Sequence, residues 1–510
     1  MDNLLSVITK VNDAVNSAVW GVPALALLVI VGILMTVLTK VFQVTHFGHW
    51  MKKTIGAVFK DKHVTSHTKD KSISQFQSLC TALAATVGTG NIVGVAGAII
   101  AGGPGAVFWM WVMAFLGMMT NYSENVLGIF YRRKNSKGEW SGGAMYYLRD
   151  GLGSKKGCKQ IGKVLAVLFS VFCLIAAFGI GNMTQVNSIS ENMDAVFGIP
   201  TWVTGVVIMI LVGLVVVGGL KRIASVTEKI VPFMVILYMI GTIAIFFINI
   251  SHVGSVFTSI FKGAFATEAA AGGIVGYGIK LAIEQGMKRG VFSNEAGLGS
   301  SVMVHSNSNT HEPVKQGMWG IFEVFADTIV VCTLTAFAIL SSGLINLESG
   351  RLVSETFTTQ AGVIIKLEKS NLVSAVFNQQ FGFIGSAFIA ISIMLFAFST
   401  VLGWSHYGTK ACEYLLGEKR TTPYRVLFVL LVFGGAVMGN NLAWDLADTF
   451  NGLMMIPNLI GVIALSGIVM KITKNYVDRR IKGRTDVKPM LSAFPEIQEE
   501  QEANLMETDD

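Results

Sequence analysis

The sequence predicts an all-α polytopic membrane protein with about 11 transmembrane helices. Hydrophobic residues make up 52% of the 510-residue chain and charged residues only 14%, with a mean hydropathy of +0.58, whereas soluble proteins carry about 25% charged residues. Apolar stretches of about 20 residues, the length that crosses a bilayer, recur from residue 17 to residue 471. The expected spans are 17–42, 75–100, 105–131, 161–186, 200–218, 227–249, 272–304, 316–342, 380–405, 423–440 and 453–471.

Lysine and arginine set the expected orientation of the chain. Of the 39 basic residues, 31 fall in the tail and one set of alternate loops, and only 5 in the other set. The positive-inside rule therefore predicts an inner cell membrane protein in contact with lipid, with the N-terminus outside and the C-terminus in the cytoplasm. The net charge of +7 has the same origin and does not indicate a nucleic-acid partner. The acidic tail 495–510 is expected to be disordered.

The number of spans suggests an internal repeat. The first span is too long for a signal-peptide core and is expected to be retained. Without it, ten spans divide into two groups of five with opposite orientation. In such inverted repeats the interrupted helices occupy corresponding positions and form the binding site. The expected organisation is an extra helix with a basic loop, 1–74, two five-helix repeats, 75–250 and 251–475, and a cytoplasmic tail, 476–510.

The first helix of each expected repeat is interrupted. Gly88, Thr89, Gly90 and Asn91 break the first, and each glycine costs about 1 kcal/mol in a helix interior relative to alanine. In hydrocarbon the freed backbone groups need partners, and a substrate carboxylate at the amides or a cation at the carbonyls would serve. The second break is VFSNEAGLGSS (291–301). Glycines that pack helices together are the alternative explanation of both stretches.

The placement of 268–290 stays open at this point. Lys280, Glu284 and Lys288 follow at intervals of four residues just before the second break. Either this face lines a water-filled vestibule, or the stretch 268–287 lies as an amphipathic helix on the outer surface.

Six stretches resemble the landmarks of a known family, in the family's order. They are ATVGTGNIVGVA (85–96), GGPGAVFWMWVMAFLG (102–117), GGAMYYL (142–148), FGIGNMTQ (178–185), RGVFSNEAGLGS (289–300) and FSTVLGWSHYG (398–408). The chain is similar in these stretches to the alanine or glycine:cation symporter family, from about residue 17 to residue 475. The resemblance implies a LeuT-type core of two five-helix inverted repeats plus the extra N-terminal helix. It also implies cotransport of a small amino acid with sodium or, in some members, a proton.

The same resemblance implies a binding site at the two breaks. Its implied substrate-binding residues are Thr89, Gly90, Asn91, Gln185, Phe292, Ser293, Asn294, Thr400 and Trp404. The amides of the first break would receive the substrate carboxylate, and polar groups of the second would hold the ammonium. Trp404 and Phe292 would limit the size of the side chain. The implied sodium ligands are the carbonyls of Ala84 and Val87 and the hydroxyls of Ser399 and Thr400, hard oxygen donors that suit an alkali cation.

Among the acidic residues that fall inside the expected spans, four are candidate functional groups: Glu124, Glu295, Glu323 and Asp327. Ionisable groups are costly in a membrane interior and point to function. Proton coupling, cation binding and a structural ion pair with Arg289 or Lys280 stay open as their roles. Glu295 is expected either to cap the half-helix after the break or to touch the substrate. Three histidines are expected in soluble loops at the cytoplasmic ends of helices: His305, His311 and His406.

The sequence therefore predicts a secondary active transporter that couples sodium to the symport of alanine, glycine or D-alanine by alternating access. A proton-coupled amino-acid symporter is the first alternative, and an amino-acid or ion channel is the second. A membrane-bound enzyme is disfavoured because the sequence contains no HExxH, Walker A or GxSxG motif. No cofactor is expected besides the coupling ion.

Overall fold

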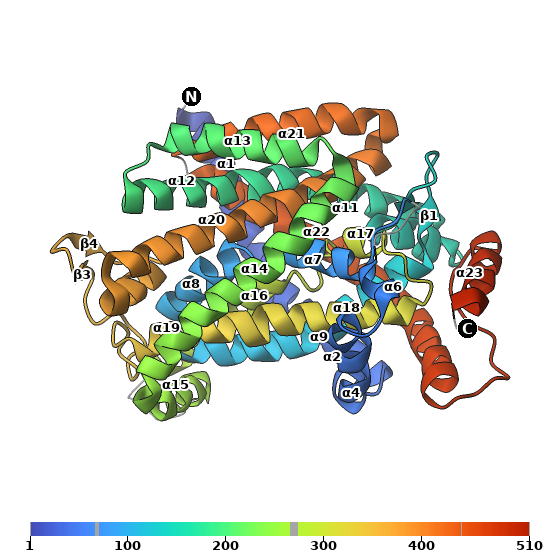
Figure 1. Cartoon of the computed structure of the whole chain (residues 1–510), viewed down its shortest axis with the longest axis horizontal. Helices are drawn as coiled ribbons and strands as arrows, with labels where there is room; N and C mark the ends of the chain where they lie inside the picture. Colours follow the sequence, from blue (N-terminus) through green and yellow to red (C-terminus); the bar gives the residue numbers. More distant parts are fainter. Residues whose placement is uncertain (1, 67–70, 266–273, 440, 509–510) are drawn as a thin grey trace.

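The computed structural model describes residues 2–66, 71–265, 274–439 and 441–508 as a bundle of helices with two short β-hairpins (Figure 1). The chain begins with α1 (Asp2–Val19) and α2 (Val22–Leu38), which pack against the later helices α22 and α9. Four short helices follow, and they are α3 (Phe42–Thr45), α4 (Phe47–Lys53), α5 (Ile55–Val58) and α6 (Lys62–Thr65).

The first expected repeat contains one broken helix and several long ones. Its elements up to the first hairpin are α7 (Gln75–Thr86), η1 (Thr89–Asn91), α8 (Val93–Gly102), α9 (Gly105–Phe130), β1 (Arg133–Lys134) and β2 (Trp140–Ser141). After the hairpin come α10 (Ala144–Tyr146), η2 (Tyr147–Gly151), η3 (Leu152–Ser154), α11 (Lys159–Phe178), the π-helix η4 (Gly179–Met183), α12 (Thr184–Phe197), α13 (Thr201–Val216) and α14 (Gly219–Ile248).

The second expected repeat also begins with a broken helix. Its elements up to the second hairpin are η5 (Ile250–His252), α15 (Val253–Phe265), α16 (Ile274–Asn294), α17 (Val302–His305), α18 (Pro313–Val324), the π-helix η6 (Phe325–Cys332) and α19 (Thr333–Ser341). The rest are β3 (Thr356–Thr358), β4 (Ile364–Lys366), α20 (Leu372–Leu416), which is kinked at Gly382, η7 (Glu418–Arg420), α21 (Thr421–Ala436), α22 (Asn441–Tyr476), η8 (Val477–Ile481) and α23 (Pro495–Thr508).

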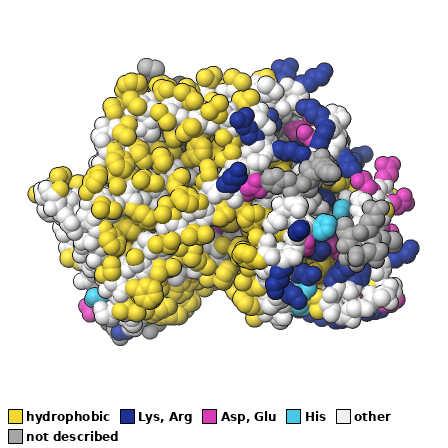
Figure 2. All heavy atoms as spheres, in the orientation of Figure 1, with side chains coloured by type: hydrophobic (Ala, Val, Ile, Leu, Met, Phe, Trp, Pro, Cys, Tyr) yellow, Lys and Arg dark blue, Asp and Glu magenta, His cyan; other side chains and the backbone are white. Residues whose placement is uncertain are grey.

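The surface and the helix lengths are those of a membrane protein. Six helical stretches among the described residues are long and apolar enough to cross a bilayer, and the bent pair α7 and α8 makes a seventh. Apolar side chains cover most of the face over α13, α14 and α20, and lysines and arginines gather at the end near the C-terminus (Figure 2). The all-helical membrane class is confirmed. The number of 11 crossings, the domain boundaries and the LeuT-type division into five plus five stay predictions.

Two expectations about the cytoplasmic side are wrong. The tail is helical as α23, because its sequence consists mostly of good helix formers and Glu500 pairs with Lys134 at 2.6 Å. His305 and His406 lie in the interior, with exposed fractions of 0% and 3%, since the helices that carry them pack against the bundle core. His311 does lie in a loop, where Gln501 of the tail helix contacts its Nδ1.

Candidate functional site

The first interruption separates α7 from α8 by a bend of 60°. Val87 (ψ 90°) and Gly88 (φ −137°, ψ −152°) are extended, so the last helical hydrogen bond of α7 is donated by the Val87 amide to the carbonyl of Leu83. The amide of Gly88 instead donates to Oδ1 of Asn91 at 2.9 Å. A side chain thus replaces a helical carbonyl in a buried bend, and the predicted break is confirmed.

The second interruption reverses the chain between α16 and α17. Glu295, Gly297 and Gly299 have φ values of +56°, +94° and +72°. Such left-handed values suit glycine and are unusual for glutamate. The Glu295 carboxylate accepts from the hydroxyl of Ser300 at 2.5 Å and from Nε1 of Trp404 at 3.0 Å. These two bonds connect the break to α20.

A buried hydrogen-bonded cluster joins the two interruptions. Asn91 Nδ2 donates to Ser293 Oγ at 3.0 Å and to Asp327 Oδ1 at 2.7 Å. The hydroxyls of Ser293 and Thr328 both donate to Asp327 Oδ2 at 2.7 Å. Asp327 therefore lies at the centre of the site, on η6. The sequence offered one signal for it, an acidic residue inside an apolar span.

A small cavity of about 20 Å³ lies beside this cluster. Its lining residues are Ala85, Thr86, Gly88, Thr89, Gly90, Ile180, Gln185, Phe292, Glu295, Thr400, Trp404 and Asn451. Six of the nine residues expected to bind substrate line it. Asn91, Ser293 and Asn294 lie behind the wall, where Asn294 Nδ2 donates to Thr328 Oγ1 at 3.0 Å. The volume holds about one water molecule, so an amino acid requires the walls to move.

The wall of the small cavity is held by contacts from α12 and α20. The Thr89 hydroxyl donates to Oε1 of Gln185 at 3.1 Å, and Gln185 Nε2 donates to the carbonyl of Ile180 at 3.1 Å. A Cβ at Gly88 would lie 2.5 Å from Oγ1 of Thr400. The broken backbone therefore needs glycine here to approach α20.

The indole of Trp404 also depends on a glycine. A Cβ at Gly181 would lie 2.3 Å from the nearest indole carbon. Gly181 is part of η4, so this π-helix presents bare backbone to the ring. Trp404 is 2% exposed, and its position is fixed by this contact and by the bond to Glu295.

A larger cavity of about 630 Å³ adjoins the small one. Thr89, Gly90, Ile180 and Phe292 line both. Elsewhere its walls carry charged side chains from several segments, namely Glu191, Arg289, Glu368, Lys369, Asp445 and Asp448. The larger cavity is a polar vestibule, and the four shared residues form its floor.

The vestibule accounts for the charged residues in the last turns of α16, just before the second break. Lys288 pairs with Asp448 at 3.0 Å, and Arg289 lines the vestibule. Lys280 pairs with Glu284 at 3.7 Å and is exposed. The vestibule interpretation therefore holds for the last turns of α16, while 266–273 lie outside the described residues.

The expected sodium ligands come from the end of α7 and the middle of α20. The hydroxyl of Ser399 donates to the carbonyl of Ala84 at 3.3 Å. Val87 lies in the bend, and the Thr400 hydroxyl donates to the carbonyl of Phe396 at 3.0 Å beside Gly88. Buried carbonyl and hydroxyl oxygens thus face one another across the two helices, a donor set that fits an alkali cation.

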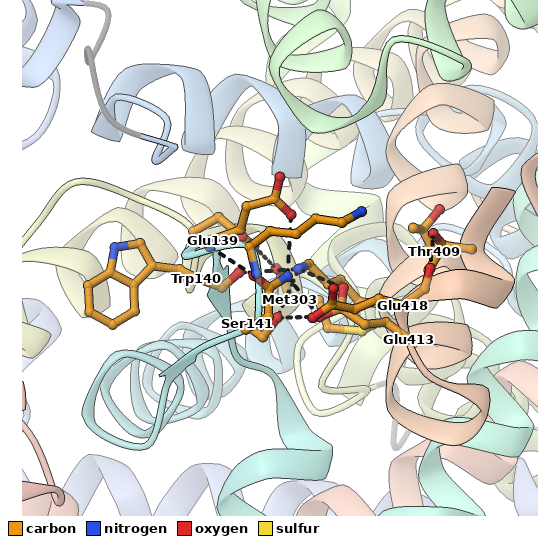
Figure 3. A network of polar contacts seen from close by, with 12 residues as sticks. Glu139, Trp140, Ser141, Met303, Thr409, Glu413 and Glu418 are labelled. Carbon is orange, nitrogen blue, oxygen red and sulfur yellow. Dashed lines mark hydrogen bonds and ion pairs between the residues drawn. The ribbon is translucent and has the colours of Figure 1, made fainter.

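A polar network fastens the β1–β2 hairpin to the end of α20 (Figure 3). Ser141 Oγ donates to Oε1 of Glu413 at 2.5 Å, and Lys410 Nζ donates to Oε2 of the same carboxylate at 3.0 Å. Lys410 also donates to the carbonyl of Trp140 at 3.2 Å. The network anchors the helix whose middle supplies hydroxyls and an indole to the small cavity.

The four candidate acidic residues inside the spans make no ion pair with Arg289 or Lys280 among the described residues. Glu124 accepts from Nδ2 of Asn458, and Glu323 contacts His305. Glu295 lines the small cavity, and both of its expected roles, capping the half-helix after the break and touching the substrate, stay predictions.

Known proteins are similar to this chain over most of its length. The model of the sodium:alanine symporter family matches residues 5–490. The sodium/alanine symporter AgcS of Methanococcus maripaludis is 42% identical over 474 residues, 92% of this chain and 97% of that protein. The probable sodium/glutamine symporter GlnT of Bacillus subtilis is 36% identical, over 92% of this chain and 91% of that protein. A crystal structure of the Eremococcus coleocola manganese transporter covers 88% of each chain at 10% identity, with a TM-score of 0.47.

These similarities define the class of the protein. The family and the relatives with named functions are transporters, so the protein is a transporter and not an enzyme. It is a multi-pass membrane protein that couples a cation to the movement of an amino acid, and the family supports sodium as a coupling ion. The chain belongs to the sodium:alanine symporter family.

Proposed function

We propose that the protein carries L-alanine, D-alanine or glycine into the cell together with sodium by alternating access. The observation that carries the proposal is the meeting of two helix interruptions in the buried cluster of Asn91, Ser293 and Asp327. Interrupted helices leave backbone amides and carbonyls for a charged substrate and an ion. The cluster brings the two interruptions together beside one cavity.

The ligands would divide between the two breaks and α20. The substrate carboxylate binds the amides of Thr89 and Gly90, which begin the half-helix after the first break. The ammonium faces the acceptors Gln185 and Glu295, which also line the small cavity. Sodium binds the carbonyls of Ala84 and Val87 and the hydroxyls of Ser399 and Thr400. This division is supported by the hydrogen bond between Ser399 and Ala84.

Small substrates fit the walls of this cavity best. Trp404 and Phe292 close it, and its volume of about 20 Å³ leaves little room. Opening Phe292 toward the vestibule would join the two cavities and admit a short side chain. A long side chain would meet the indole, which Gly181 and Glu295 hold in place.

The orientation belongs to the same proposal. With the N-terminus outside, the vestibule opens to the exterior beside residues 187–192, 368–370, 438–439 and 445–448. The gathering of lysine and arginine at the end near the C-terminus supports a cytoplasmic tail (Figure 2). The described conformation is then the outward-facing one, and the whole chain forms two five-helix repeats, 75–250 and 251–475.

Uptake of labelled alanine into proteoliposomes tests the coupling ion. An inward sodium gradient is expected to drive accumulation, and a proton gradient alone is not. Accumulation with the proton gradient alone would establish the proton-coupled alternative, and saturable accumulation with neither gradient would refute symport. Competition by unlabelled glycine, D-alanine and glutamine then measures the substrate range, and strong competition by glutamine would refute the size limit.

A further inference from the structure

A second polar cluster lies inside the bundle, away from both cavities. Its centre is Glu323 on α18, whose side chain has an exposed fraction of 0%. Oε2 of this carboxyl accepts from Nε2 of His305 at 3.0 Å and from Nδ2 of Asn121 at 3.2 Å. Oε1 is buried and has no hydrogen-bond partner within the part of the chain that the structure describes. Half of the carboxyl is thus unsatisfied.

The other buried carboxyls are satisfied more completely. Asp327 accepts from three side chains, and Glu295 has a donor on each oxygen. Glu124 accepts from Asn458 and from two backbone amides. Within the described residues none of the four pairs with a lysine or an arginine. Glu323 is therefore the member of the group with an unused oxygen, and a buried charge without a partner is unfavourable.

The hydrogen bonds around His305 determine which of its ring nitrogens carries the proton. The hydroxyl of Ser308 donates to Oε1 of Gln316 at 2.8 Å, and this turns Nε2 of Gln316 toward Nδ1 of His305. Nδ1 is then an acceptor, and Nε2–H donates to Glu323. A neutral imidazole in this tautomer supplies a hydrogen bond to the carboxylate but no charge.

Asn125 adds a second unpaired acceptor to the cluster. Its Nδ2 donates to Oδ1 of Asn121 at 2.8 Å, while its own Oδ1 is buried and meets no donor from the described residues. Asn121 and Asn125 lie on α9, which runs beside α18 (Figure 1). Two acceptor oxygens of the cluster, Glu323 Oε1 and Asn125 Oδ1, therefore lack a donor among the described residues. A proton on the carboxyl supplies a donor, whereas a hard cation takes about six oxygen ligands, more than the cluster leaves unpaired.

We propose that Glu323 is a proton-binding site whose carboxyl takes up and releases one proton during the transport cycle. The O–H bond forms at Oε1 when the carboxylate takes a proton from water, and the proton returns to water when that bond breaks. The site goes beyond the sodium coupling proposed above and does not rest on it.

The position of the cluster connects this proton to the interrupted helices. His305 ends α17, which follows the second interruption, and its Nδ1 lies 3.3 Å from the hydroxyl of Ser78 on α7, before the first interruption. The bond from the imidazole to Glu323 is charge-assisted only while the carboxyl is ionised. Protonation therefore loosens α18 from α17 and α7, at the cytoplasmic side in the proposed orientation.

Several titratable groups face Glu323 from the elements packed around it. They are His305 on α17, Glu124 on α9, Glu295 between α16 and α17, Asp327 on η6 and Tyr407 on α20. The test therefore compares single substitutions, which change one of these groups at a time.

Proton binding by the purified full-length protein tests the site without transport. Potentiometric titration above about pH 5, where exposed carboxyls are already ionised, is expected to show one proton fewer per chain in Glu323→Gln than in wild type. The exposed control Glu348→Gln is expected to match wild type. Glu323→Asp keeps a carboxyl and is expected to retain the step at a shifted midpoint. Glu323→Asp replaces Glu323→Gln as the test variant if the glutamine substitution prevents folding. Equal proton binding by Glu323→Gln and wild type would overturn the proposal. A titration curve of Glu323→Asp identical to that of wild type would also overturn it.

Transport at matched internal and external pH tests the consequence. With a constant sodium gradient, alanine uptake by wild type is expected to rise as pH falls. Uptake by Glu323→Gln, whose side chain is neutral at every pH, is expected to equal at all pH values the uptake that wild type reaches at acid pH. A wild-type pH profile in Glu323→Gln would contradict the coupling. Loss of bound radioactive sodium in this variant, with proton binding unchanged, would make the cluster a sodium site instead. Absence of sodium-driven uptake in every variant would refute the proposed symport, while the titration would still decide the fate of the proton site.

Discussion

Nδ2 of Asn91 lies 2.7 Å from Oδ1 of Asp327, and this hydrogen bond connects the first helix interruption to the π-helix η6. The same amide donates to Ser293 in the second interrupted helix. One side chain thus holds together three segments that are distant in sequence. Because all these groups are buried, the loss of one side chain leaves each of its partners with one hydrogen bond fewer inside the bundle.

The substitution Asn91→Ala is expected to lower sodium-driven alanine uptake by about 10- to 100-fold, since a hydrogen bond to a charged group contributes about 1.5–3 kcal/mol. The amide of Gly88 and the Asp327 carboxylate would both lose a partner. Initial uptake rates, normalised to inserted protein, measure the effect. Thr258→Ala on the exposed face of α15 serves as the control. Wild-type uptake by Asn91→Ala would show that the cluster has no part in transport.

Ser399→Ala is expected to raise the sodium concentration for half-maximal uptake about 5-fold, because removing one hydrogen-bonding oxygen costs about 1 kcal/mol. The maximal rate at saturating sodium should change less. Ser392→Ala on the same helix is a matched control, since its buried hydroxyl bonds only its own helix at the carbonyl of Phe388 among the described contacts. A sodium dependence equal to that of the control would remove Ser399 from the sodium site.

Gly181→Ala is expected to abolish uptake, because the new methyl group would lie 2.3 Å from the nearest indole carbon of Trp404. The indole is buried, and moving it away from the methyl group would break its hydrogen bond to Glu295. Gly434→Ala makes the same change in α21, where nothing lies within 4 Å of the new methyl group. It should transport normally. Uptake and thermal stability of both variants decide the matter, and equal behaviour would mean that the Trp404 contact is dispensable.

Trp404→Ala is expected to widen the substrate range, because the indole forms one wall of the small cavity. Larger neutral amino acids should then compete with labelled alanine, and alanine itself should bind more weakly. Trp404→Phe is the comparison, since it keeps a ring but loses the bond to Glu295. An unchanged competition profile for both variants would show that substrate size is limited elsewhere.

The docked tail is expected to release at acid pH. Burial lowers the pKa of His311 below its usual value near 6.5, so the docked state binds fewer protons than the released state. Docking is therefore unaffected above about pH 6.5 and weakens as the pH falls below it. Hydrogen exchange of α23 measures the release. His311→Gln should make the protection factor of α23, the exchange rate divided into its intrinsic value at each pH, independent of pH in this range. A protection factor that still falls with pH in this variant would assign the effect to another group.

The sequence predicted the features that depend on local composition. The membrane class followed from long apolar stretches, and both breaks followed from glycines placed where a helix should be regular, as at Gly88 and Gly297. Local chemistry is sufficient there, because hydrocarbon allows few alternatives to a helix.

Features that depend on tertiary contacts were not predictable in the same way. Asp327 meets Asn91 across a separation of 236 residues, and no spacing rule indicates this pairing. Burial of His305 depends on the packing of α17 against α7 and α9. The tail helix needed both its own helix propensity and the Lys134 partner at 2.6 Å. The acidic composition of the tail alone therefore led to the wrong prediction of disorder, where the structure has a helix.

The π-helical winding of η6 (Phe325–Cys332) has a consequence for evolution and engineering. A π-helical turn amounts to one residue inserted into an α-helix, and each residue rotates the following side chains by about 100°. Asp327 lies in η6, and Thr335, which bonds the hydroxyl of Tyr238 at 2.7 Å, lies just beyond it. Deleting a single residue between them would leave a perfectly regular helix in which only one of these two side chains could keep its partner.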